Sequence, residues 1–72
     1  MSVKELMVKG CKLASEIDEH PSPENASKIL AFANTITAMK QAEKIDARDE
    51  NVLQTLCSVL WRLYWEDGGT DV

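Results

Sequence analysis

The stretch that decides the fold runs from Pro23 to Ile45 and reads PENASKILAFANTITAMKQAEKI. Its apolar residues recur every three or four positions, which is the spacing of one face of an α-helix. They form one stripe at Ile29, Phe32, Ile36 and Met39 and a second stripe at Ala31, Ala38, Ala42 and Ile45. A helix that is apolar on two faces is normally buried by more than one neighbour. The stretch therefore predicts a central helix over residues 23–45 with another helix on each side.

A first helix is expected over residues 3–19. Ser2 and Glu5 have the Ser-x-x-Glu spacing of a capping box, in which each side chain accepts a hydrogen bond from a free backbone amide. The apolar residues that follow repeat at helical spacing, at Val3, Leu6, Leu13 and Ile17. Gly10 lies within the same stripe. It either marks the close approach of a neighbouring backbone or is an ordinary glycine, tolerated at a cost of about 1 kcal/mol relative to alanine.

The segment His20-Pro21-Ser22-Pro23 is expected to end the first helix and begin the second. Pro21 disfavours helical geometry at the residue before it. Ser22 is a favourable N-cap, and Pro23 suits the first helical position, where its missing amide proton costs no hydrogen bond. The first two helices should therefore pack antiparallel.

A third helix is predicted over residues 48–66, with Asp46 or Asp49 as its N-cap. Its apolar face is broad, and Gly68 and Gly69 should end it. Together the patterns predict an all-α, compact antiparallel three-helix bundle with helices at 3–19, 23–45 and 48–66. Residues 1–67 would form a single domain, which is near the lower size limit for a self-sufficient core and would be completed by self-association. Residues 68–72 would form a flexible C-terminal tail.

The length and net charge of the chain limit the classes of protein to which it can belong. A chain of 72 residues allows one domain with a small core. Twelve acidic and eight basic residues give a net charge of −4, which argues against broad binding to a nucleic-acid backbone. The sequence contains no apolar run of signal-peptide or membrane-span length, so we expect a soluble, cytoplasmic protein.

Few residues suited to catalysis are present. Cys11 and Cys57 could form one disulfide between helices, but the low cysteine content favours two buried free thiols in a reducing compartment. The two cysteines lack a CxxC spacing, His20 is the only histidine, and no glycine-rich phosphate loop occurs. We therefore expect no enzyme activity, no metal site and no cofactor.

One group of candidate binding residues emerges when the predicted helices are folded together. In an up-down-up bundle, the ends of the first and third helices share a pole with the start of the second. This pole would gather Asp18, Glu19, Trp61, Trp65, Glu66 and Asp67. Its carboxylates lie at helix C-termini, where the macrodipole disfavours negative charge, and tryptophans often dominate the energetics of protein interfaces. The alternative interpretation is a solvated acidic end whose tryptophans close the core. Trp65 lies further from the centre of the apolar face of the third helix, so we expect it to be exposed or to lie in an interface.

These features favour a small non-enzymatic interaction module that binds a larger protein stoichiometrically, as an inhibitor or adaptor, and forms a homodimer. Compact acidic chains of this size are common in phages and other mobile elements. The alternative is an oligomeric regulator that binds RNA, DNA or a small nucleotide through exposed bases. The candidate contacts for that function are Lys4, Lys9 and Lys12 or Lys40, Lys44 and Arg48. Neither set is interleaved with aromatic residues, which makes the second hypothesis the weaker one.

Overall fold

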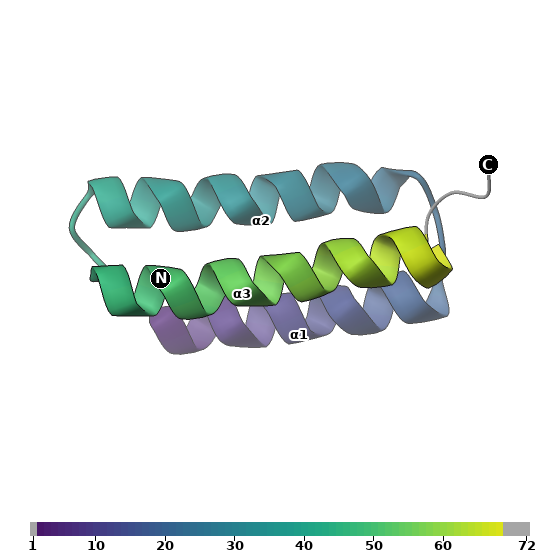
Figure 1. Cartoon of the computed structure of the whole chain (residues 1–72), viewed down its shortest axis with the longest axis horizontal. Coiled ribbons are helices and arrows are strands. Elements are labelled where there is room, and N and C mark those ends of the chain that lie inside the picture. Colours follow the sequence, from purple (N-terminus) through teal and green to yellow (C-terminus); the bar gives the residue numbers. More distant parts are fainter. Residues whose placement is uncertain (1, 69–72) are drawn as a thin grey trace.

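The structure, a computed structural model, describes the backbone of residues 2–68 and the side chains of residues 2–66. Three α-helices follow one another: α1 (Val3–Glu19), α2 (Glu24–Gln41) and α3 (Ala47–Leu63). A short π-helical segment, η1 (Tyr64–Gly68), continues α3. The helices lie side by side in an up-down-up arrangement, and residues 2–68 contain no strand (Figure 1). The predicted antiparallel three-helix bundle is confirmed.

The capping residues at the starts of α1 and α3 set where these helices begin. The Ser2 hydroxyl accepts from the Glu5 amide at 3.2 Å, and the Glu5 carboxylate accepts from the Ser2 amide at 3.1 Å, which is the predicted capping box. Asp46 caps α3 by accepting from the Asp49 amide at 2.8 Å. Of the two candidates for the third N-cap, Asp46 is therefore the residue used.

The start of α2 also follows the predicted chemistry. The assigned helix begins at Glu24, but Pro23 already has helical dihedral angles, with φ −59° and ψ −21°. The Ser22 hydroxyl accepts from the Glu24 amide at 3.1 Å. Ser22 thus accepts a hydrogen bond from an amide that the first turn of the helix leaves free.

The end of α2 differs from the prediction, because the helix stops at Gln41 and not at Ile45. Glu43 has a left-handed backbone with φ 60°, and its amide donates to the Lys40 carbonyl at 3.0 Å. The Lys44 amide donates back to the Met39 carbonyl at 2.9 Å. This pair of hydrogen bonds is a Schellman motif, which normally has glycine at the left-handed position. The turn directs Ile45 into the core, where it is buried.

The core is one cluster of buried side chains drawn from all three helices. Its fully buried members are Leu6, Ile17, Ile29, Ile36, Leu53 and Leu60, together with Phe32. The helix that packs most extensively on both others is α3, whereas α1 and α2 share a smaller contact. The expectation that residues 23–45 form the central helix is therefore wrong.

The second apolar stripe of α2 is mostly exposed. Ala31, Ala38 and Ala42 lie at the surface, and so does Leu30, which is 53% exposed. The physical reason is that α1 and α3 pack together on the same side of α2, so one broad face of that helix covers the core and the opposite face remains open. Neither α2 nor any other helix within residues 2–68 is long and apolar enough to cross a membrane.

Gly10 is buried at the place where all three helices come together. A Cβ atom at this position would overlap the Leu56 side chain of α3 and would lie 3.0 Å from Cζ of Phe32 of α2. The glycine therefore accommodates the close approach of neighbouring side chains, and not the approach of a backbone.

Candidate functional site

The predicted pole is present in the fold. The C-terminal end of α1, the N-terminal end of α2 and the end of α3 lie at the same end of the bundle (Figure 1). We call the residues Asp18, Glu19, Trp61, Trp65 and Glu66 the tryptophan pole. The sixth predicted member, Asp67, lies in η1, but its side chain is outside the described side chains.

Three aromatic rings of the α3–η1 segment meet edge-on at this pole, with Tyr64 in contact with both tryptophans. Tyr64 is buried and meets both tryptophans edge-on, at 5.8 Å and 88° for Trp61 and at 5.1 Å and 78° for Trp65. Trp61 is half-buried against the core, as expected for a residue that closes the bundle. Trp65 is 65% exposed, which confirms the prediction that it lies further from the core. Tyr64 thus contacts the exposed indole of Trp65 edge-on.

The acidic side chains of the tryptophan pole face solvent. Asp18, Glu19 and Glu66 are all exposed. Lys28 is a nearby base, but its ammonium pairs with Glu16 across the α1–α2 contact. This is the one ion pair among the side chains that the structure describes, so none of these three carboxylates is neutralised by an ion pair there. The pole presents negative charge at the same end of the bundle as an exposed aromatic ring.

One buried polar residue near this pole was missed by the sequence analysis. Asn25 is 1% exposed, and its Nδ2 donates to the His20 carbonyl at 3.2 Å. The bond ties the first turn of α2 to the end of α1 and satisfies a carbonyl that the helix terminus leaves free. An asparagine in the first turn of a helix gives no sequence signal that it will be buried, because most asparagines there are solvated.

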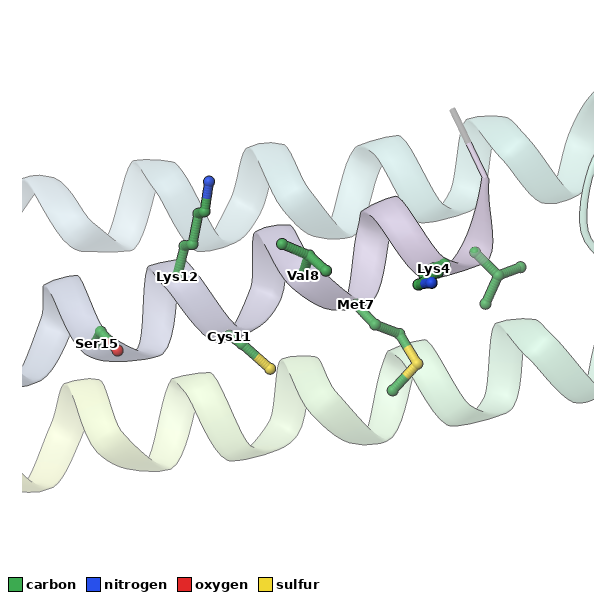
Figure 2. A pocket seen from close by; sticks show the side chains of 7 residues that line it. Lys4, Met7, Val8, Cys11, Lys12 and Ser15 are labelled. Atoms are coloured by element: carbon green, nitrogen blue, oxygen red, sulfur yellow. The ribbon is translucent and has the colours of Figure 1, made fainter.

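A second surface was also missed, along the seam of α1 and α3. A shallow depression of about 670 Å³ follows the outer side of α1 and is lined by Val3, Lys4, Met7, Val8, Cys11, Lys12 and Ser15. Figure 2 shows Met7 and Cys11 reaching from this depression toward α3, while Lys12 extends toward α2.

On the α3 side of the seam, Leu56 lies against Gly10 of α1. Val52 and Val59 are one turn before and one turn after Leu56, so they flank the same seam. Both valines are 47% exposed. We call the residues Met7, Cys11, Val52, Leu56 and Val59 the α1–α3 surface.

The two cysteines have different environments, and their sulfur atoms are not bonded. Cys57 is buried, and this burial raises the pKa of its thiol. Cys11 is exposed, so the expectation that both thiols are buried is wrong for this residue. Cys11 lies one residue beyond Gly10, and this offset of about 100° turns it off the core-facing stripe.

The candidate nucleic-acid contacts are spread over two regions. Lys4, Lys9 and Lys12 are exposed along α1, and Lys44 and Arg48 are exposed at the turn into α3, where Lys40 is half-buried. Trp65, the exposed aromatic ring described above, lies at the opposite end of the bundle from the second set. The exposed ring on which a nucleobase could stack is therefore far from Lys40, Lys44 and Arg48.

Metal-binding groups are scattered in the same way. Within the residues that the structure describes, no three histidine, cysteine, aspartate or glutamate side chains come close enough to hold a metal ion.

No protein-family model, curated protein or solved structure matches the chain.

Proposed function

We propose that the protein is a non-enzymatic helical interaction module that binds a larger protein in fixed stoichiometry, as an inhibitor or adaptor, through the tryptophan pole. The observation that carries the proposal is Trp65, a large aromatic side chain that is 65% exposed and in edge-on contact with Tyr64. Exposed tryptophans of this kind act as anchors that a partner pocket buries.

The charge around Trp65 indicates the chemistry of the partner. Asp18, Glu19 and Glu66 are exposed at the same end of the bundle as the indole, and the described side chains provide no ion pair for them. Two of these acids lie in or near the last turns of helices, where the negative end of the macrodipole adds to the local potential. A partner with an apolar pocket bordered by lysine or arginine would complement both the indole and the carboxylates.

The test is quantitative capture from native cell extract, followed by affinity measurement with each recovered protein. The test variant is Trp65→Ala with Glu66→Lys, which changes two exposed residues and should leave the helical content intact. Because tryptophan hot spots contribute about 2 kcal/mol or more, affinity for the true partner should fall at least about 30-fold.

The matched control is Leu30→Ala with Glu43→Lys. It also truncates one exposed apolar side chain and reverses one exposed charge, but away from the tryptophan pole. This control should bind like the unmodified protein. Equal binding by the Trp65 variant and the unmodified protein would refute the proposal. Recovery of nucleic acid with a steep salt dependence would instead favour the lysine-rich alternative.

A further inference from the structure

The α1–α3 surface is apolar at its centre and charged at its two ends. Met7 is 39% exposed, and Val52 and Val59 flank it across the seam with about half of each side chain in solvent. An apolar strip that continues over two helices is typical of a protein–protein contact. We infer that this surface is where two copies of the chain associate, face to face, with the helices of one copy antiparallel to those of the other.

The charges at the ends of the strip have opposite sign. Lys4 and Asp18 are separated by about four helical turns and so lie on the same side of α1. Arg48 lies in the first turn of α3 and Glu66 lies in η1, at opposite ends of the α3–η1 segment. All four side chains are exposed. One end of the α1–α3 surface therefore carries two bases and the other end two acids.

This distribution selects the relative direction of the two copies. A two-fold axis that crosses the helices places α1 over α1 of the second copy and reverses its direction. Lys4 then faces Asp18 of the other copy, and Arg48 faces Glu66. The parallel alternative would place the two bases of one copy beside those of the other, which is electrostatically unfavourable. Each antiparallel contact is made twice, as a two-fold interface requires.

The centre of the strip is compatible with this axis. Gly10 and Leu56 are in contact and mark the midpoint of the seam. Cys11 follows Gly10 and is exposed, so the Cys11 thiols of the two copies would lie close to the axis. Arg62, on the outer edge of α3, would come opposite Val52 and not opposite another base, because Arg48 faces Glu66.

The size of the surface predicts a weak dimer. About 14 residues of helix at about 1.5 Å each, and two helices about 9 Å apart and about 10 Å across, give a face on the order of 400 Å² per copy. The total of about 800 Å² lies below the usual size of specific interfaces, in the range of weak and transient ones. We therefore expect a Kd on the order of 10–100 μM, so that association depends strongly on concentration.

Sedimentation velocity over a range of concentrations tests the association and its location. The unmodified chain should shift from monomer to dimer, and Val59→Glu should raise the Kd at least about tenfold, because it places a carboxylate in the apolar strip. The matched control is Thr37→Glu, which adds the same charge at an exposed position on α2. Monomer at about 1 mM, well above the expected Kd, would refute the inference, as would a dimer that Val59→Glu does not weaken.

A charge exchange tests the antiparallel direction. Lys4→Glu and Asp18→Lys should each weaken the dimer, and the double variant should restore it, because the paired charges are then exchanged in both copies. Each change also places its new charge favourably relative to the α1 macrodipole, so the fold should not suffer. A double variant that is weaker than both single variants would contradict the antiparallel arrangement.

Oxidation provides an independent distance measurement. Treatment with diamide, which takes up the two thiol hydrogens, should join two chains through a Cys11–Cys11 disulfide. The Cys11→Ser variant should give no covalent dimer, and Cys57 should remain reduced because it is buried. If a Cys11 cross-link does not form while the chain is dimeric, the axis cannot pass near Cys11 and the inference fails.

The α1–α3 surface and the tryptophan pole share the carboxylates of Asp18 and Glu66, so the two proposals are separated by variants of residues that only one of them uses. Trp65 lies about 120° around the helix from Val59, on another side of α3. Trp65→Ala should therefore leave the dimer unchanged, whereas Val59→Glu should leave the tryptophan pole intact. Failure of one proposal can thus be distinguished from failure of the other.

Discussion

Gly10 of α1 lies directly beneath Leu56 of α3, and the space between them is too small for one additional carbon atom. Replacing Gly10 with alanine would gain about 1 kcal/mol in helix propensity but would force the Leu56 side chain outward. It would also bring the new methyl group to 3.0 Å from Phe32, a buried residue with little room to move. Overpacking typically costs about 1–3 kcal/mol, so we expect Gly10→Ala to lower the unfolding free energy by about 1 kcal/mol.

A double-mutant cycle checks the cause of this loss. Leu56→Ala should be less destabilising in the Gly10→Ala background than in the unmodified protein, because it removes the overlapping side chain. We expect a coupling of about 1 kcal/mol, measured by urea unfolding. Additive effects of the two substitutions would show that the Gly10–Leu56 contact does not limit the packing.

Replacing Glu43 with glycine should stabilise the protein. Glu43 has a left-handed backbone in the Schellman turn after α2, a conformation that costs a residue with a Cβ atom roughly 1–2 kcal/mol. Allowing for the greater freedom of glycine in the unfolded chain, we expect Glu43→Gly to raise the unfolding free energy by about 1 kcal/mol. Glu43→Ala removes the same carboxylate but keeps the backbone cost, so an equal gain from alanine would mean that charge was responsible.

Replacing Asn25 with alanine should destabilise the turn between α1 and α2. The substitution leaves the His20 carbonyl without the donor that now lies 3.2 Å away, in a partly buried position. An unsatisfied buried group costs about 1–3 kcal/mol, and thermal unfolding should report a loss in that range. Asn34→Ala is the control, because Asn34 is an exposed asparagine of the same helix. Equal effects of the two substitutions would rule out a special role for the Asn25 bond.

Acidification should weaken the cap of α1. The backbone amide of Ser2 is the main cause that lowers the pKa of Glu5 below its ordinary value of 4.5, and the Ser2 hydroxyl adds to the effect. A lowered pKa means that the carboxylate stabilises the fold fully above its unfolded-state pKa and loses this contribution as the pH falls through the folded-state value. The unfolding free energy of Glu5→Gln should therefore vary less with pH below about 4.5. Identical pH dependence in both proteins would contradict this.

The two thiols should react at very different rates. Cys11 is exposed, whereas burial of Cys57 raises the pKa of its thiol and lowers the fraction of reactive thiolate. In the folded protein at mildly alkaline pH, a thiol-specific disulfide reagent should label Cys11 rapidly and Cys57 only after the helices open. Cys11→Ser should abolish the rapid phase. Rapid labelling that persists in this variant would show that Cys57 is accessible.

Sequence reasoning located the elements that have local chemical signals. Ser2, Ser22 and Asp46 are capping residues whose hydrogen bonds are formed as their positions suggested. The order of the helices and the short turns between them were enough to predict that the helix ends of the tryptophan pole come together. Trp65 was placed outside the core because it lies off the centre of the apolar stripe, and it is the more exposed of the two tryptophans.

The features that were missed depend on tertiary contacts. The end of α2 is determined by the left-handed backbone of Glu43. Glycine is the residue that usually marks such a position in a sequence, and glutamate does not predict it. The burial of Asn25 depends on the carbonyl of His20 at the end of another helix. Apolar residues such as Val59 and Ala38 have helical spacing whether they are covered or exposed, so periodicity alone could not show which faces lack a neighbour.

The extensive contact of α3 with both other helices has a consequence for the order of folding. Most of the packing of α1 is against a helix that follows it only after the whole of α2, while the direct α1–α2 contact is small. During synthesis, the first hairpin would thus have little core of its own, and its apolar residues would stay uncovered until residues 47–63 emerge from the ribosome. Folding of this chain should therefore be a late, nearly all-or-none event that begins when the third helix closes the hairpin.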